Sequence, residues 1–432
     1  MRWGSAGLLA IGFVGAIGMA AQAAEPAKSI WDQDTLTGDW NGARAALKAK
    51  GIDVTINYIG ETFAVLSGGI RRSPSYEGRL EFSVDTDLEK FAGWAGASTH
   101  ITVYNIHSTD KNVVANVGSI ADPSNIDALQ TTRLFTAWFQ QNWFNDKLSL
   151  RVGQLAADDE FISSPTAGGL INGTFGWAST LAANMTSGGP AYPLAAPGVR
   201  LQFKPTDEIA ILTALFSGDP AGNNCNNLPQ VCNRYGTTFS FAGGTLWLNE
   251  LQYGVNQGKD AKGLPAVYKI GFWYASADFA DQRFATTHSG NWGVYGVADQ
   301  TVWKGASSSL ALFLRAGAVP SDRNLVSFYV DGGAGIKGLF PGRADDTLSF
   351  GVAYEKISPN AVAADRAAGL PIVRSNEVVF ELSYQAQLAP WWTLQPDFQY
   401  IVHPGGNVAN PNNLANPIRN AAVIGLRSAI KF

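Results

Sequence analysis

Hydrophobic and polar positions alternate along most of this chain, and the end of the sequence shows the pattern most clearly. In the last segment one parity carries the apolar side chains Ala422, Ile424, Leu426, Ile430 and Phe432. Arg427 and Lys431 fall on the other parity. Successive side chains of a strand point to opposite faces, so one face here is apolar and the other can contact water. A final strand that ends in an aromatic residue is typical of bacterial outer-membrane barrels.

The same period of two begins at Asp53 and continues to the end of the chain. In the second predicted strand Leu80 and Phe82 share one face, whereas Glu77 and Glu81 share the other. The pattern predicts sixteen strands, near residues 53–64, 76–87, 97–107, 132–143, 147–157, 198–204, 208–216, 244–253, 266–277, 291–302, 309–317, 325–336, 347–356, 377–386, 392–402 and 421–432.

The connections between these strands alternate in length. Those after even-numbered strands are mostly short, whereas many of those after odd-numbered strands are long: 108–131, 158–197, 217–243, 357–376 and 403–420. Short periplasmic turns and long outer loops are the expected asymmetry of an outer-membrane barrel. We therefore expect an all-β fold, a 16-stranded antiparallel transmembrane β-barrel over residues 53–432, with both termini on the periplasmic side.

The N-terminal region has a different organisation. Arg2, the apolar run Leu8–Met19 and the small residues Ala21-Gln-Ala23 predict a signal peptide over residues 1–23, hence export to the outer membrane. Residues 24–52 would form a periplasmic segment with one short helix from Asp39 to Ile52. No later segment offers roughly 18 uncharged apolar residues, the length that a membrane-spanning helix needs.

Composition narrows the possible partners and cofactors. The formal net charge of −4 argues against a nucleic-acid partner. Cys225 and Cys232 form a close pair in an exported chain and predict a disulfide in an outer loop, with free thiols or a metal pair as the less favoured alternative. No cluster of histidines and cysteines has the spacing of metal ligands, so we expect neither a metal nor a cofactor.

A barrel of sixteen strands encloses an aqueous channel rather than a packed core, and a selective channel needs a constriction. Residues 158–197 form a connection much longer than is needed to join two strands, and such long loops usually have a function. In porins the third outer loop is the one that folds inward, so we expect this segment to form the constriction.

The candidate pore-lining residues are those that suit sugars. Hydroxyl groups pair with carboxylates and guanidinium groups, and the C–H face of a sugar packs on aromatic rings. The candidates on strands are Glu77, Arg79, Glu81, Arg151, Arg200, Arg315 and Asp397, those in the long loop are Asp158, Asp159 and Trp177, and those at the channel mouth are Arg71 and Arg72. A solvated wall is the alternative role of the charged residues, and an anchor for the loop is the alternative role of Trp177.

Several segments, taken in their order, resemble the carbohydrate-selective porins of the OprB type. They are Trp31–Arg44, Ser67–Arg72 with Tyr76–Arg79, Arg151–Leu155, Ile171–Trp177, Phe216–Pro220, Ala298–Thr301 and Pro320–Asn324. The resemblance implies a sixteen-stranded barrel that passes glucose and similar sugars, with its N-terminal helix near the periplasmic mouth. The stretch Ile162–Gly169 is less bulky than expected for the family, which would widen or retune the constriction.

Two other functions remain as alternatives. The arginines would also serve a general or anion-preferring porin. An outer-membrane barrel enzyme would need a nucleophile and a base, and none of the four histidines, His100, His107, His288 and His403, lies in a nucleophile-elbow sequence. We therefore expect no enzymatic activity. The expected partners are sugars as permeating solutes and outer-membrane lipid, and the sequence leaves open whether the protein is a monomer or a homotrimer.

Overall fold

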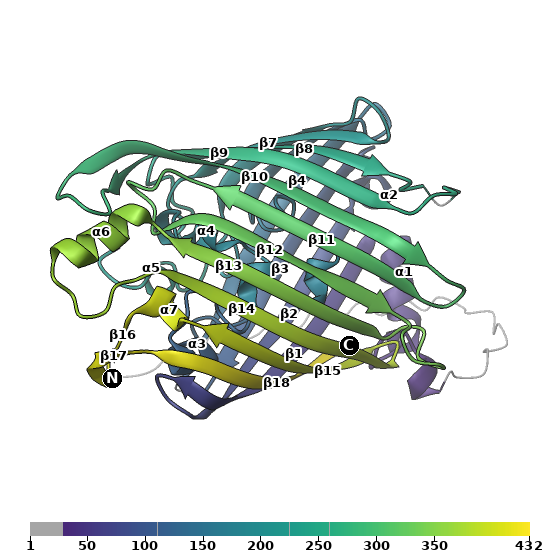
Figure 1. Ribbon diagram of the computed structural model, residues 1–432. Helices are drawn as coiled ribbons and strands as arrows, with labels where there is room; N and C mark the ends of the chain where they lie inside the picture. Colours follow the sequence, from purple (N-terminus) through teal and green to yellow (C-terminus); the bar gives the residue numbers. More distant parts are fainter. Residues whose placement is uncertain (1–28, 110, 224, 259) are drawn as a thin grey trace, which may run out of the picture.

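The computed structural model describes residues 29–432 except 110, 224 and 259 (Figure 1). The predicted signal peptide lies outside the described residues. Sixteen antiparallel strands close into one barrel. They are β1 (Ile52–Gly69), β2 (Pro74–Asp87), β3 (Ala97–Ser108), β4 (Thr131–Trp143), β5 (Leu148–Leu155), β6 (Ala196–Phe203), β7 (Ile209–Ser217), β8 (Thr245–Val255), β9 (Ala266–Ala280), β10 (Thr287–Lys304), β11 (Ser309–Ala318), β12 (Val326–Lys337), β13 (Thr347–Ile357), β14 (Asn376–Ala389), β15 (Trp392–Val402) and β18 (Arg419–Lys431).

The predicted number, order and pairing of the strands are confirmed. We number the outer loops L1 (70–73), L2 (109–130), L3 (156–195), L4 (218–244), L5 (281–286), L6 (319–325), L7 (358–375) and L8 (403–418). Other short helices are α2 (Leu88–Ala92) between β2 and β3, α6 (Pro359–Ala367) in L7 and α7 (Pro404–Asn407) in L8. L8 also holds a small sheet of β16 (Ala409–Asn410) and β17 (Asn413–Pro417). Among the described residues, no helix is long and apolar enough to cross a membrane.

The N-terminal helix is shorter than the sequence predicts. We expected it from Asp39 to Ile52, whereas α1 covers Ala43–Ala49 and follows a 3-10 turn, η2 (Trp40–Gly42). Gly42 has a φ of +88°, which breaks the helical path at this point. Asp39 still accepts the N–H of Ala45 at 3.0 Å.

The barrel closes between its first and last strands. The register of β1 and β18 pairs Asn57 with Lys431, and the N–H of Phe432 donates to the carbonyl of Ile56 at 2.8 Å. The guanidinium of Arg44 donates to the carbonyl of Phe432 at 2.6 Å. The N-terminal segment is therefore fastened to the closing seam, at the barrel end where the C-terminus lies (Figure 1).

The two faces of the strands differ as the alternating pattern predicts. Outward apolar side chains such as Phe82 and Leu426 are exposed, and inward charged side chains such as Glu381 and Arg315 are buried. Aromatic residues gather near strand ends, where Trp391 stacks on Trp31 and on Trp392. Such belts of aromatic residues suit the membrane interface.

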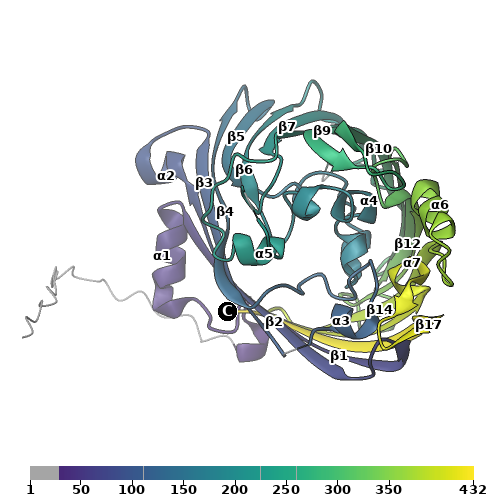
Figure 2. The same ribbon diagram turned by 90° about the vertical axis from the view of Figure 1, so that its left-hand side faces the viewer.

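Three outer loops lie within the ring of strands. Looking down the barrel, α3 (Val113–Val117) of L2, α4 (Ser179–Ala182) of L3 and α5 (Pro229–Cys232) of L4 all lie inside it (Figure 2). L3 also contains three 3-10 turns, η3 (Ala167–Gly169), η4 (Gly173–Phe175) and η5 (Thr186–Gly188). The hydrophobic core sits between L3 and the barrel wall, where Phe175 meets the ring of Phe313 edge-on.

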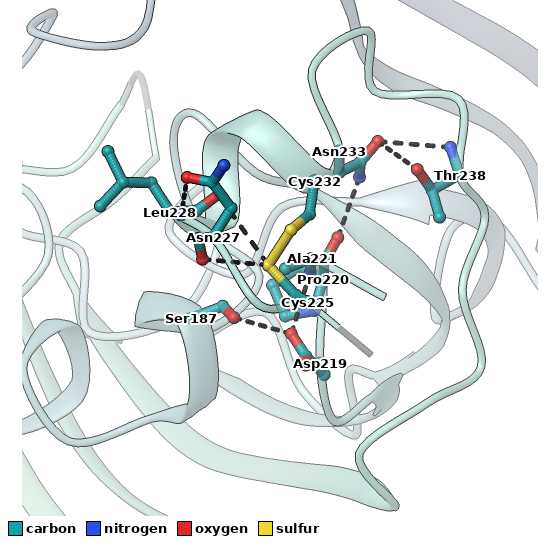
Figure 3. Close-up of a disulfide and its surroundings, with 10 residues drawn as sticks. All are labelled: Ser187, Asp219, Pro220, Ala221, Cys225, Asn227, Leu228, Cys232, Asn233 and Thr238. Atoms are coloured by element: carbon teal, nitrogen blue, oxygen red, sulfur yellow. Dashed lines mark hydrogen bonds between the residues drawn. A yellow bond between two sulfur atoms is a disulfide. The ribbon is translucent and has the colours of Figure 1, made fainter. Parts of the chain in front are cut away.

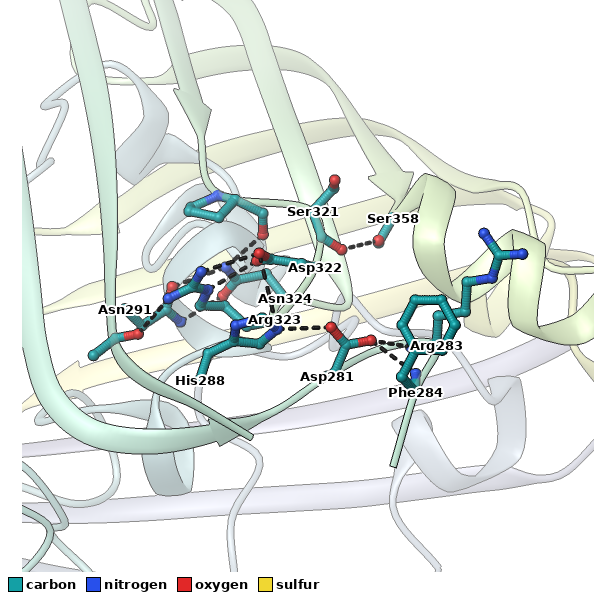
Figure 4. A network of polar contacts seen from close by, with 12 residues as sticks. Asp281, Arg283, Phe284, His288, Asn291, Ser321, Asp322, Arg323, Asn324 and Ser358 are labelled. Atoms are coloured by element: carbon teal, nitrogen blue, oxygen red, sulfur yellow. Dashed lines mark hydrogen bonds and ion pairs between the residues drawn. The ribbon is translucent and has the colours of Figure 1, made fainter. Parts of the chain in front are cut away.

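L5 and L6 are joined at the outer rim by a polar network (Figure 4). The Nε2 of His288 lies 2.6 Å from an Oδ of Asp281, and Arg323 pairs with Asp322 at 2.8 Å. The hydrogen bond with His288 and the N–H groups of Phe284 and Arg283 lower the pKa of Asp281 to about 2. Asp281 therefore carries a negative charge that helps to hold L5 folded at neutral pH.

Candidate functional site

L3 is held against the inner wall by carboxylates of three different strands. The N–H of Ile162 donates to Glu250 of β8 at 2.7 Å, and the N–H of Asn172 donates to Glu381 of β14 at 2.9 Å. The N–H of Thr166 donates to Asp299 of β10 at 2.9 Å. A buried backbone N–H that lacks an acceptor costs about 1–3 kcal/mol, so these carboxyls stabilise the inward position of L3. The predicted inward fold of this loop is confirmed.

L2 is held inside the barrel in the same way, which the sequence analysis missed. The N–H of Val113 donates to Glu77 at 2.8 Å, and the N–H of Ala121 donates to Glu377 at 2.9 Å. The hydroxyl of Ser124 donates to Glu61 at 2.6 Å. The sequence signal for this arrangement is the number of inward carboxylates on the strands. Buried carboxylates need hydrogen-bond donors, and the strands do not supply enough of them, so a loop must fold inward to do so.

L2 and L3 are also bonded to each other. The N–H of Asn125 donates to the carbonyl of Ile171 at 2.9 Å, and the N–H of Gly173 donates to the carbonyl of Asp122 at 2.8 Å. The hydroxyl of Tyr192 donates to the carbonyl of Ile126 at 2.7 Å. The two loops therefore narrow the channel as a single unit.

A cavity of about 680 Å³, which we call the vestibule, lies between L2, L3 and α5. Asp127, Asp158, Trp177 and Tyr192 are among its lining residues. Asp127 Oδ2 and Asp158 Oδ1 have no hydrogen-bond partner among the described residues. Burial raises the pKa of Asp127 to about 6 and that of Asp158 to about 7. Two carboxyl groups whose charge depends on pH therefore border the vestibule.

Two arginines of the channel wall lie on aromatic rings. The guanidinium carbon of Arg79 is 4.6 Å from the ring centroid of Tyr104 and 5.2 Å from that of Tyr192. The guanidinium carbon of Arg151 is 4.0 Å from the ring centroid of Trp138. Cation–π contacts of this kind hold a flat guanidinium in a fixed orientation.

Glu160 of L3 joins the arginine wall to the loop. Its carboxylate lies 2.8 Å from Arg200 and 3.6 Å from Arg151. Glu81 lies 3.8 Å from Arg79. Desolvation of the neighbouring Asp159 carboxyl beside the channel wall raises its pKa to about 6, although Arg151 opposes the rise. The structure therefore brings Arg79, Glu81, Arg151, Arg200, Asp158 and Asp159 together beside L3.

Three other candidates lie away from the open channel. Glu77 is 1% exposed and holds L2. Arg315 is fully buried, pairs with Asp331 and donates to the carbonyls of Ile162 and Thr174. Asp397 is buried and accepts a hydrogen bond from Gln399 at 2.9 Å.

The remaining candidates have mixed positions. Trp177 is 8% exposed, and its indole N–H donates to the carbonyl of Gly188 at 3.0 Å. This contact fits the role of an anchor for the loop. Trp177 is also one of the residues that line the vestibule. Arg71 donates to Asn116 of L2 at 2.9 Å, whereas Arg72 is exposed in L1.

Arg133 is a charged residue of this region that the sequence analysis missed. Its side chain is 1% exposed and donates to the carbonyl of Asn233. Arg133 Nε and Nη1 have no hydrogen-bond partner within the described part of the chain. The parity of its strand would have placed it on the inward face.

The predicted disulfide between Cys225 and Cys232 is present in L4 (Figure 3). It closes a short turn that includes α5.

The comparisons with known proteins agree with this architecture. The family model described as "Carbohydrate-selective porin, OprB family" matches residues 71–432. Porin B of Pseudomonas aeruginosa is 26% identical over 470 residues, which cover 98% of this chain and 96% of that protein. The putative porin QuiX of Acinetobacter baylyi is 23% identical over 455 residues, which cover 94% and 95%.

Among solved structures, the high-pH structure of Pseudomonas putida OprB superposes with a TM-score of 0.83 at 22% identity. The match covers 94% of this chain and 100% of that chain, so it supports the same fold. The family match extends over most of the sequence and the relative from P. aeruginosa over nearly all of it. The chain therefore belongs to the OprB family of carbohydrate-selective porins, which form channels in the outer membrane and are not enzymes.

Proposed function

We propose that the channel passes neutral monosaccharides down their concentration gradient and selects them beside L3. The observation that carries this proposal is the placement of Arg79 and Arg151 on aromatic rings next to the acidic residues of L3. A fixed guanidinium donates to sugar hydroxyls in a planar fork. Asp127 and Asp158 line the vestibule, and their carboxyl groups are suited to accept hydrogen bonds from sugar hydroxyls.

Charge pairing supports neutral solutes over ions. Arg151 and Arg200 share Glu160, and Arg79 has Glu81 beside it. A charged solute must compete with these pairs, whereas a hydroxyl can join them without changing the net charge. Weak, multiple contacts of this kind let a solute enter and leave quickly.

A preference for anionic solutes is the second candidate, and Arg133 favours it. Two of its guanidinium nitrogens have no hydrogen-bond partner among the described residues. Reversal potentials in a salt gradient distinguish the two functions. Strong anion selectivity without a block by glucose supports the second candidate.

The test of the first candidate is the block of ion current by glucose in planar bilayers. Arg79→Lys keeps the positive charge but loses the planar guanidinium and much of its contact with the rings. The lost contact is worth about 1 kcal/mol, so the glucose concentration that blocks half of the current should rise roughly fivefold. Arg283→Lys is the matched control, because Arg283 also lies over a ring, Phe284, but in the exposed loop L5. No block of the unaltered protein, or equal effects of both variants, contradicts the proposal.

We also propose that residues 1–23 are removed as a signal peptide, so that the periplasmic segment 24–52 precedes the barrel domain 53–432. The positive residue Arg2, the apolar run and the small residues before Ala24 support this division. The mass of the protein purified from outer membranes should correspond to a chain that begins at Ala24. A mass that includes Met1 contradicts it.

A further inference from the structure

The disulfide-closed turn of L4, residues 225–232, lies over the channel. Looking down the barrel, α5 is inside the ring of strands and near β4 and β6 (Figure 2). Leu228, Pro229, Gln230 and Val231 line the vestibule together with L2 and L3. The turn is therefore part of the wall that a solute passes before it reaches the arginines.

The C-terminal side of this turn is anchored to the channel. The side-chain oxygen of Gln230 accepts the N–H of Leu129 in L2 at 2.6 Å. The carbonyl of Tyr235 accepts the N–H of Leu134 at 3.0 Å, and that of Gly236 accepts the amide of Gln154 at 2.9 Å. These bonds fix the position of α5 relative to L2 and β4.

On the N-terminal side, the chain before the turn is anchored, because Asp219 accepts the hydroxyl of Ser187 at 2.7 Å and the carbonyl of Pro220 accepts the amide of Asn233 at 2.9 Å (Figure 3). The exposed edge is limited to Asn226, Asn227 and Leu228, and Leu228 is 68% exposed. A helix as short as α5 is unstable without other support, and the exposed residues bury too little apolar surface to provide that support. Between these anchors, the bond from Cys225 to Cys232 closes the exposed edge onto α5.

We propose that the disulfide-closed turn is an outer size filter, separate from the constriction beside L3. It would limit the length of the saccharide that enters the vestibule, with the side chain of Leu228 at its free edge. This proposal rests on the proposed function, because it assigns a selectivity for chain length to the same sugar channel. Loss of the disulfide should free the edge and admit longer saccharides without changing the contacts that select monosaccharides.

The experiment compares liposome swelling with glucose, maltose and maltotriose. The Cys225→Ser/Cys232→Ser variant, or the unaltered protein reduced with a phosphine, should raise the maltotriose rate relative to glucose by at least about threefold. Leu228→Trp keeps the disulfide and enlarges the free edge, so it should lower the rates of maltose and maltotriose more than the rate of glucose. Heat-modifiable migration in gels verifies that each variant forms a barrel.

Exclusion of graded polyethylene glycols from the ion-conducting pore gives a second readout that needs no sugar specificity. The double serine variant should admit larger polymers than the unaltered protein does. The Leu228→Trp variant should exclude some of the polymers that the unaltered protein admits. Unchanged polymer cut-offs and unchanged maltotriose-to-glucose ratios overturn the size filter. A pore that excludes glucose but changes its polymer cut-off as expected overturns the proposed function and leaves the filter supported.

Discussion

Glu381 of β14 accepts the N–H of Asn172 at 2.9 Å, across 209 positions of sequence. The other carboxylate oxygen accepts the N–H of Ile171. One inward side chain of the barrel thus holds the middle of L3, at the point where L3 also bonds to L2. The width of the channel depends on strand carboxylates that never need to contact the solute.

We therefore expect Glu381→Ala to loosen the constriction. A buried N–H left without its acceptor costs about 1–3 kcal/mol, so the loss of two such bonds releases this part of L3 from the wall. Single-channel conductance should become larger and noisier, and glucose should block less. Glu208→Ala, in the exposed turn between β6 and β7, is the control. A quiet channel of unchanged conductance would show that Glu381 does not hold the loop.

Arg315 gives a second prediction, about stability. Its buried guanidinium pairs with Asp331 and supports two carbonyls of L3. Arg315→Met leaves Asp331 as an unpaired buried charge, which costs about 3–5 kcal/mol. The temperature at which the barrel unfolds in gels should fall clearly.

The matched control for this prediction is Arg343→Met. Arg343 pairs with Asp346 at 2.6 Å, but its own side chain is 39% exposed, and Asp346 keeps the hydrogen bonds from Tyr384 and Gln387 when Arg343 is replaced, so this change should lower stability less than Arg315→Met. The double variant Arg315→Met/Asp331→Leu should recover part of the stability, because no buried charge remains unpaired. If Arg315→Met and Arg343→Met lowered the unfolding temperature of the barrel by the same amount, the role given to Arg315 would be refuted.

Arg79 and Arg315 show how far the sequence predicts this site. The period of two places both side chains on the inward face, and it correctly gives sixteen strands and a closed seam. It cannot distinguish a residue that faces water from one covered by an inward loop, because both positions are polar. Arg79 lies beside the vestibule residue Tyr192, whereas Arg315 is fully buried under L3.

The inward fold of L2 was missed for a related reason. Its length resembles that of an ordinary outer loop, and the donors that attach it to the wall are backbone N–H groups of residues such as Val113 and Ala121. Backbone donors are common to every residue type, so no side-chain pattern in L2 reveals them. The signal lies instead in their acceptors, Glu77 and Glu377, on distant strands.

Ion selectivity should depend on pH through the vestibule carboxyls. Burial raises the pKa of Asp158 to about 7, with a contribution from Asp159, and burial raises that of Asp127 to about 6. These groups therefore hold protons in mild acid and become anionic as the pH rises. Reversal potentials should shift towards cation selectivity between about pH 5 and about pH 8.

The same shifts determine how these carboxyls affect stability. A folded-state pKa above the unfolded value means that the native state binds the proton more tightly. The contribution of Asp127 and Asp158 to the free energy of unfolding therefore favours the folded state at low pH and is lost as the pH rises through about 6 to about 7.

Asp127→Asn and Asp158→Asn should each flatten the pH dependence of the reversal potential. Asp345→Asn, in the exposed turn between β12 and β13, should not change this pH dependence. An unchanged pH profile in both vestibule variants contradicts the assignment.

The last residue should matter for assembly and not for sugar selectivity. Deletion of Phe432 removes the hydrogen bond from its N–H to Ile56 and the carbonyl that Arg44 contacts. Both contacts lie at the seam between β1 and β18, far along the chain from the selective residues of L3. We expect a smaller fraction of heat-modifiable barrel in outer membranes, with a normal glucose block in the fraction that assembles.

Phe432→Ala separates the two contributions of this residue, because it keeps the backbone contacts and removes only the ring. An assembly defect as large as that of the deletion would assign the effect to the aromatic side chain, which suits the membrane interface. A defect limited to the deletion would assign it to the hydrogen bonds that close the seam. A deletion variant that assembles normally but loses its glucose block would show that the closing strand acts in selection, contrary to its place in the barrel.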